Sequence, residues 1–189
     1  EIRAGLNTFR ASVNQTPGRM NLFNLGKHHA LVDYAHNPAS YEALGGFVRN
    51  WTSGQRVGVV GGPGDRRDED FIMLGKLASE IFDCIIIKED DDNRGRKRGS
   101  AAELITQGIR EVNPNCLHET VLDEAEAINK ALDLATDDSL VVILPESVSR
   151  AIKLIKARGV IEEEIEPKYD SKTPRDKEVG VPSSVLNSI

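Results

Sequence analysis

The stretch His28-His29-Ala30-Leu31-Val32-Asp33-Tyr34-Ala35-His36-Asn37-Pro38 decides the fold of this chain. Its apolar run, Ala30 to Val32, is too short for a helix and is typical of a strand. Polar side chains follow where that strand would end. Asn37 and Pro38 are residue types favoured at a helix N-cap and at the first helical position. The stretch therefore predicts strand, polar turn and helix, an arrangement in which ligands bind beyond the strand end and the helix N-terminus favours anions.

The same alternation continues along the chain. We expect strands at 56–60, 84–87, 117–122 and 140–144, and helices at 38–51, 69–82, 100–112, 123–135 and 145–158. Ser100 and Glu103 have the spacing of a capping box for the third of these helices. Strands at 22–25 and 29–32, joined by a turn at Gly26-Lys27, predict a hairpin. The pattern predicts an α/β fold: a Rossmann-like, mostly parallel sheet with helices on both faces and a short antiparallel element at the start.

Both ends of the chain differ from this pattern. Ile2, Leu6 and Phe9 have helical spacing, so residues 1–12 are interpreted as the end of a linker helix that follows an upstream domain. Residues 13–165 form the α/β domain. The chain turns polar after Ile161, and residues 166–189 are expected to be a flexible tail.

Composition excludes several classes of function. A net charge of −6 argues against a general nucleic-acid surface. The longest apolar runs are far too short to cross a membrane, and no stretch has the pattern of a signal peptide. Two cysteines are too few for a disulfide framework, and no metal site can be argued from the residues. We therefore expect a cytoplasmic protein with neither a nucleic-acid nor a membrane partner.

Five motifs, in this order, resemble the C-terminal domain of the Mur ligases, which are ATP-dependent amino-acid ligases. They are Pro17-Gly18-Arg19-Met20-Asn21, Asp33-Tyr34-Ala35-His36-Asn37-Pro38, Gly61-Gly62-Pro63-Gly64-Asp65-Arg66-Arg67, Lys88-Glu89-Asp90-Asp91-Asp92-Asn93-Arg94-Gly95-Arg96 and Leu144-Pro145-Glu146-Ser147. The similarity runs from about Gly5 to about Gly159. It is strongest to members of the family that add arginine to an aspartate-rich chain. The resemblance implies a domain that holds the incoming amino acid and one side of ATP.

Four residues are candidates for ATP binding: Arg19, Asp33, His36 and Asn37. A carboxylate can accept hydrogen bonds from both ribose hydroxyls, and the planar arginine fork matches phosphate oxygens. Imidazole and amide groups can donate to phosphate or lie near the base. The structural alternatives are a helix cap for Asp33, a surface position for His36 and a solvated loop charge for Arg19. The resemblance implies ATP contact for this motif and for the arginine of the Pro-Gly-Arg turn.

The glycine-rich loop at 61–67 lacks the Gly-Lys-Ser/Thr ending of a phosphate-binding loop, so it is not interpreted as an independent nucleotide site. Its glycines would let the backbone approach a ligand, and charged side chains could fix the ends of that ligand. The resemblance implies that this loop borders the active site. Gly64, Asp65 and Arg66 are therefore candidates for substrate binding.

The charged loop after the strand at 84–87 and the residue after the last strand provide the other substrate-binding candidates. These are Asp91, Asp92, Asn93, Arg94, Arg96 and Glu146. Carboxylates suit a cationic side chain and an arginine suits an α-carboxylate, although charge runs are usually only solvated. The resemblance implies that this loop selects the amino acid. Relatives that take diaminopimelate have Asp-Asn-Pro-Arg here, whereas this chain has Asp-Asp-Asn-Arg, which favours a different amino acid, arginine.

The chain contains no phosphate-loop lysine, and no catalytic residue is assigned. The resemblance implies that Mg²⁺ and much of the ATP are bound by an upstream central domain of the same polypeptide, and that an aspartate-rich peptide is the acceptor. The isolated chain is accordingly expected to be inactive. Two alternatives stay open: a stand-alone α/β nucleotide-binding or regulatory module without ligase activity, and an interaction domain whose acidic face binds basic partners. A homo-oligomer of the longer enzyme is also left open.

Overall fold

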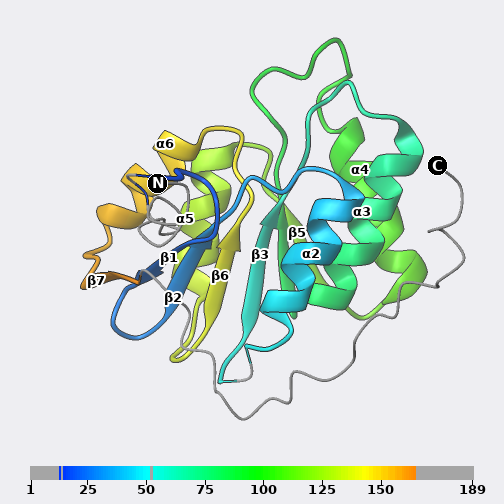
Figure 1. Ribbon diagram of the computed structural model, residues 1–189. Coiled ribbons are helices and arrows are strands. Elements are labelled where there is room, and N and C mark those ends of the chain that lie inside the picture. Colours follow the sequence, from blue (N-terminus) through cyan, green and yellow to red (C-terminus); the bar gives the residue numbers. More distant parts are fainter. Residues whose placement is uncertain (1–12, 14, 52, 165–189) are drawn as a thin grey trace, which may run out of the picture.

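Seven strands form one sheet in the order β5-β4-β3-β6-β2-β1-β7. In the computed structural model, which describes residues 13, 15–51 and 53–164, the strands are β1 (Asn21–Asn24), β2 (His29–Val32), β3 (Arg56–Val60), β4 (Cys84–Ile87), β5 (Leu117–Thr120), β6 (Leu140–Ile143) and β7 (Glu162–Glu164) (Figure 1). The predicted linker helix at 1–12 and the predicted tail at 166–189 lie outside the described residues.

The sheet is mostly parallel, as predicted. Strands β5, β4, β3, β6 and β2 run parallel to one another, and β1 pairs antiparallel with β2 so that Leu22 lies opposite Leu31. Strand β7 was not predicted, because the run Glu162-Glu163-Glu164 has no apolar alternation. Its backbone pairs antiparallel with β1, with Glu163 opposite Phe23. Backbone pairing at a sheet edge thus creates a strand where the side-chain pattern gives no signal.

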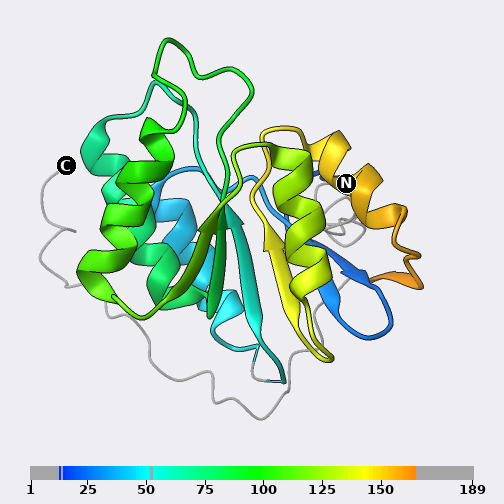
Figure 2. The same ribbon diagram turned by 180° about the vertical axis from the view of Figure 1, so that it is seen from behind.

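Helices cover both faces of the sheet. They are α2 (Pro38–Val48), α3 (Asp68–Ile81), α4 (Ser100–Val112), α5 (Glu124–Leu134) and α6 (Val148–Lys156). Helices α2, α3 and α4 lie on one face, and α5 and α6 lie on the other, as the two opposite views show (Figures 1 and 2). Strand β2 contributes to both cores, since Leu31 packs on one side while Ala30 and Val32 pack on the other. The predicted Rossmann-like α/β class is therefore confirmed.

At the N-terminus of α2 the cap predicted from the local sequence is present, whereas at the N-terminus of α4 the predicted cap is absent. Asn37 caps α2 as predicted, and its side-chain oxygen accepts the Ser40 N–H at 2.9 Å. The capping box predicted from Ser100 and Glu103 is wrong, because Ser100 is already helical. The carboxylate of Glu89, on the loop after β4, instead accepts three backbone N–H groups at the start of α4, those of Gly99, Ala101 and Ala102. A buried charge from another loop thus satisfies donors that the helix leaves free.

Helices α3 and α4 pack at very close range through two glycines. A Cβ on Gly75 would lie 2.1 Å from the carbonyl oxygen of Ile105, and one on Gly108 would lie 2.0 Å from the carbonyl oxygen of Ile72. Backbone atoms cannot rotate away as side chains can. Each helix therefore needs a residue without a side chain at its contact point.

We predict that Gly108→Ala lowers the free energy of unfolding by about 1–3 kcal/mol, the usual cost of overpacking. The control is Gly46→Ala on α2, where an added Cβ meets nothing within 4 Å. That change should stabilise the helix by about 0.5–1 kcal/mol, because alanine loses less backbone entropy than glycine. Urea unfolding followed by circular dichroism measures both. Equal effects of the two substitutions would contradict the close contact.

Candidate functional site

Four polar loops meet at the carboxyl edge of the sheet. They follow β2, β3, β4 and β6, and because these strands are parallel neighbours their ends lie at one edge. A cavity of about 290 Å³ opens there, lined by Tyr34, His36, Pro63, Asp65, Arg66 and Arg94. A narrower cavity of about 20 Å³ shares Tyr34, His36 and Pro63 and adds, among others, Gly61, Lys88, Asp90, Pro145 and Glu146. The structure thus gathers the predicted loops around one hollow.

The Pro-Gly-Arg turn is fixed against the polar turn after β2. Gly18 has φ +76°, and a Cβ there would lie 2.6 Å from the Val148 side chain, so only glycine fits without movement. The backbone N–H of Met20 donates to Asp33 at 3.1 Å. The guanidinium of Arg19 lies 5.2 Å from the centre of the Tyr34 ring, within cation–π range. Two predicted nucleotide contacts, Arg19 and Asp33, are therefore brought together.

The imidazole of His36 is oriented by its own turn. Its Nδ1 lies 2.9 Å from the Tyr34 carbonyl oxygen, which can only accept, so Nδ1 carries the proton and Nε2 points elsewhere. The His36 and Tyr34 rings lie 5.1 Å apart. Asn37 uses its side-chain oxygen as the helix cap, which leaves its amide nitrogen for other partners. Tyr34 was not among the predicted site residues, although it lies inside the quoted motif and is 37% exposed.

The glycine-rich loop after β3 is bound to the charged loop after β4. Arg94 pairs with Asp65 at 2.8 Å, and this contact lowers the pKa of the Asp65 carboxyl. Arg96 donates to the carbonyl oxygens of Gly64 and Arg66 at 2.9 and 2.7 Å. Arg96 therefore holds the two loops together.

Gly64 and Asn93 mark the closest approach of these loops. A Cβ on Gly64 would lie 2.1 Å from the Asn93 carbonyl oxygen. The expectation was that the glycines make room for a ligand. At Gly64 the structure gives a different reason, since the space beside it is filled by the neighbouring loop.

A buried group of charges lies beneath the edge, and it was missed in the sequence. The Lys88 ammonium, with its side chain 1% exposed, lies 2.7 Å from Asp90 and 3.0 Å from Glu124. Glu124 is fully buried at the start of α5. Positions 88 and 124 are far apart in the sequence, so no local spacing could link them.

Two predicted substrate residues, Asp91 and Glu146, contact each other. The Asp91 N–H donates to the Glu146 carboxylate at 2.8 Å, and the Asp91 carboxylate pairs with Arg150 at 2.7 Å. This hydrogen-bonded contact raises the pKa of the Arg150 guanidinium. Asp92 accepts the Arg94 N–H at 2.9 Å. Within 13, 15–51 and 53–164, no salt bridge reaches Glu146 or Asp92, so these two carboxylates stay available.

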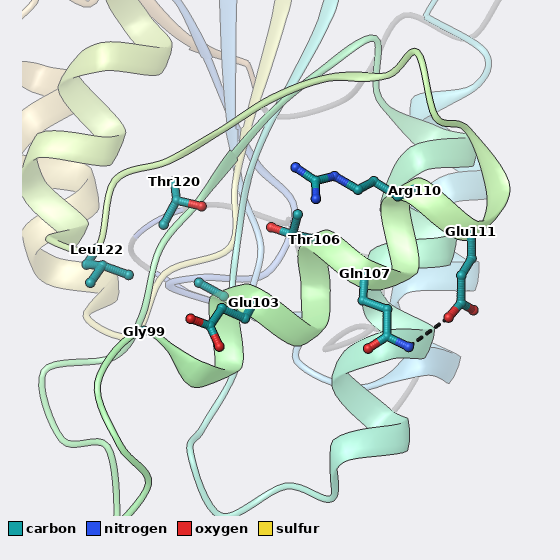
Figure 3. Close-up of a pocket in the computed structure, with 9 residues that line it drawn as sticks. Gly99, Glu103, Thr106, Gln107, Arg110, Glu111, Thr120 and Leu122 are labelled. Atoms are coloured by element: carbon teal, nitrogen blue, oxygen red, sulfur yellow. Dashed lines mark hydrogen bonds between the residues drawn. The ribbon is translucent and has the colours of Figure 1, made fainter.

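A wider groove of about 690 Å³ lies elsewhere, along α4 and the edge strand β5 (Figure 3). It is lined by Gly99, Ala102, Glu103, Thr106, Gln107, Arg110, Glu111, Thr120 and Leu122. Gln107 and Glu111 hydrogen-bond to each other at 2.8 Å across one helical turn. This groove contains none of the predicted site residues.

Neither a metal cluster nor a membrane span is found in the described part of the chain. No group of three or more His, Cys, Asp or Glu side chains there is arranged to hold a metal ion. No helix among these residues is both long enough and apolar enough to cross a membrane.

The sheet, its two helical layers and the loops gathered at its carboxyl edge define an α/β domain with a polar cavity at the strand ends. The chain belongs to the Mur ligase family: the family model described as Mur ligase, glutamate ligase domain, matches residues 18–147. The resemblance predicted from the five motifs is thereby confirmed.

Relatives from three organisms show which members of the family this chain is similar to. The chain is 72% identical over 190 residues to cyanophycin synthetase of Nostoc sp., covering 100% of this chain and 21% of that protein. It is 64% identical over 160 residues to cyanophycin synthetase of Synechocystis sp., covering 85% and 18%. A UDP-N-acetylmuramoyl-L-alanyl-D-glutamate--2,6-diaminopimelate ligase of Aquifex aeolicus is 31% identical over 128 residues, covering 68% and 26%. The chain thus spans about a fifth of the length of its cyanophycin synthetase relatives.

Solved structures share the fold. A UDP-N-acetylmuramoyl-L-alanyl-D-glutamate--2,6-diaminopimelate ligase superposes with a TM-score of 0.58 at 21% identity, over 83% of this chain and 37% of that one. A bifunctional folylpolyglutamate synthase/dihydrofolate synthase of Yersinia pestis, complexed with AMPPNP and a Mn ion, gives 0.59 at 23% identity, over 82% and 33%.

We predict that Gly64→Ala forces the two loops apart and lowers the free energy of unfolding by about 1–3 kcal/mol, as overpacking does. Trypsin should then cut the loop at 88–99 faster, because its arginines lose their partners. The control is Gly62→Ala in the same loop, where an added Cβ makes only ordinary contacts at 3.5 Å. Urea unfolding and timed proteolysis test this. Equal cleavage rates in the two variants would contradict the close contact between the loops.

Proposed function

We propose that this chain is the C-terminal domain of an ATP-dependent amino-acid ligase of the cyanophycin synthetase type. It binds the incoming amino acid, arginine, and one side of ATP, while an amide bond forms on an aspartate-rich backbone. The single observation that carries this is the 72% identity to a cyanophycin synthetase over the whole chain. The gathering of the predicted loops around one cavity supports it.

The proposed ATP contact is made by Arg19, Asp33, His36 and Asn37, of which His36 lines the cavity and the others lie in the turns beside it. Arg19 lies over the Tyr34 ring, which orients its fork without consuming all of its donors. Asp33 uses one oxygen for the Met20 N–H, and its other oxygen can accept from a ribose hydroxyl. A guanidinium, an aromatic ring, a carboxylate and an imidazole that lie close together, as those of Arg19, Tyr34, Asp33 and His36 do, fit a nucleotide.

The upstream central domain of the same polypeptide is proposed to hold Mg²⁺ and the remaining phosphate contacts. When bound, Mg²⁺ neutralises charge on the transferring phosphoryl group. ATP transfers its γ-phosphoryl group to the acceptor carboxylate and leaves as ADP; the amine of the amino acid then attacks the acyl-phosphate, and the amide forms with release of phosphate and a proton. In this reaction the present chain binds and orients the amine-bearing substrate, so the proposal assigns it no catalytic residue.

The opposite side of the cavity is the proposed amino-acid pocket. Glu146 and Asp92 make no salt bridge among the described residues, so they suit a guanidinium. Arg66 and Arg94 line the larger cavity, which adjoins the narrower one lined by Glu146, and they suit the α-carboxylate. Asp91, Asn93 and Arg96 are assigned a supporting role, because they contact other parts of the chain itself.

The ATP assignment predicts that, in the longer enzyme, Arg19→Ala and Asp33→Ala impair use of ATP more than use of arginine. Each removes a charged hydrogen bond, so the KM for ATP should rise by roughly tenfold to a hundredfold. Arg110→Ala, in the groove on α4, is the matched control and should leave both KM values unchanged. Steady-state kinetics with each substrate varied decides. An unchanged KM and kcat for ATP in both variants would count against the assignment.

The amino-acid assignment predicts that Glu146→Gln and Asp92→Asn weaken the preference for arginine over lysine. A guanidinium binds a carboxylate at two points and an ammonium at one, so losing the carboxylate should lower kcat/KM for arginine by about tenfold to a hundredfold. Lysine should lose less. Glu103→Gln on α4 serves as the charge-matched control. If the parent's rate and preference persist in both variants, the pocket lies elsewhere.

A further inference from the structure

The loops after β4 and β6 need a link, because their strands are not neighbours. Strand β3 lies between β4 and β6 in the sheet. The Lys88 backbone crosses close to the end of β3, where a Cβ on Gly61 would lie 2.6 Å from the Lys88 carbonyl oxygen. The proposed amino-acid pocket uses side chains from both loops, Asp92 from one and Glu146 from the other. Its shape therefore depends on whatever fixes the distance between them.

Glu124 provides this link from beneath the sheet edge. Its fully buried carboxylate accepts the backbone N–H groups of Glu146 and Ser147, which belong to the loop after β6. The same carboxylate lies 3.0 Å from the Lys88 ammonium, which belongs to the segment after β4. Lys88 in turn holds Asp90 at 2.7 Å. One carboxylate on α5 thus contacts both loops.

The contacts of Glu124 also fix the direction of Glu146. The backbone of Glu146 is held by Glu124, and its carboxylate accepts the Asp91 N–H at 2.8 Å. Arg150 spans the same gap, 2.7 Å from Asp91 and 3.7 Å from Glu124. The half-buried Glu146 carboxylate, which is proposed to contact the substrate, is therefore oriented by the fully buried Glu124, which cannot contact it.

We propose that Glu124 is a positioning residue of the amino-acid pocket, which holds the Asp90–Asp92 segment and Glu146 at the separation that a guanidinium needs. This inference rests on the proposed function, which puts the amino acid between these loops. Glu124 is fully buried, so it acts through Glu146 and Lys88 and does not touch the substrate. A buried carboxylate with three donors around it has little freedom to adapt, which suits it to fix a distance.

The test is Glu124→Gln in the longer enzyme, which keeps the shape and removes the charge. We expect the KM for arginine to rise by about tenfold or more while the KM for ATP stays within about twofold. Hydrogen exchange of the peptide covering Leu144–Val148 should become faster. Glu124→Asp keeps the charge on a shorter side chain and should recover part of the arginine KM. Glu126→Gln, an exposed change in the same helical turn, is the control and should change nothing.

The outcomes separate this inference from the proposed function. Unchanged exchange at Leu144–Val148 overturns it. So does faster exchange with an unchanged arginine KM, provided that Glu146→Gln does raise that KM. If neither variant changes the arginine KM, the proposed pocket itself is wrong and the inference falls with it. If Glu124→Gln does not fold, the double variant Lys88→Met/Glu124→Gln, which removes both buried charges, is measured instead. Failure of that variant to fold, or a normal arginine KM in it, overturns the positioning role.

Discussion

The Lys88 ammonium, buried between Asp90 and Glu124, is the interaction on which the carboxyl edge depends. A buried charge without a partner costs several kcal/mol, and Lys88 avoids that cost through two carboxylates, so removing one of them leaves the ammonium with a single partner. The partners of Lys88 belong to the loop after β4 and to α5, and through Glu124 the contact extends to the loop after β6. Gly61 is required where the Lys88 segment crosses β3. The loops at the edge are thus built on one buried ionic contact.

The charges at the edge then divide into two groups. The side chains of one group make contacts within the protein: Glu89 caps α4, Arg96 joins two loops, and Asp91 pairs with Arg150. The other group includes Glu146, which lines the narrower cavity, and Asp92, which lies on the neighbouring loop, and neither makes a salt bridge in the described part of the chain. A loop rich in both signs of charge can therefore be rigid and still present carboxylates to a ligand.

Much of the fold could be predicted because its signals are local. Short apolar runs predicted four of the five parallel strands, the fifth, β5, had a weaker signal, and Asn37-Pro38 predicted the start of α2. The gathering of the loops also followed, since parallel strands place their carboxyl ends at one edge. The parts of the fold that the sequence did not predict depend on pairs of residues that lie far apart in the chain. Strand β7 needs the edge of β1, and the cap of α4 comes from Glu89, so neither leaves a pattern in its own segment.

The placement of several candidate site residues could be predicted for the same reason. The motifs contain Arg19, Asp33 and Glu146, and the structure places all three at the carboxyl edge. Lys88 and Glu124 were missed as a pair because one follows a strand and the other begins a helix 36 positions later, a spacing that no local pattern links. Tyr34 was missed although the motif contains it, since its role depends on the ring lying against Arg19 and His36. Only the folded arrangement distinguishes carboxylates that support the loops from those that face the cavity.

The most direct test of this account is an experimental structure of the longer enzyme with arginine bound. The account predicts that the guanidinium lies within hydrogen-bond distance of the Glu146 carboxylate, with Arg66 or Arg94 near the α-carboxylate. Arginine bound in the groove on α4, or on another domain, with water at Glu146, would contradict it.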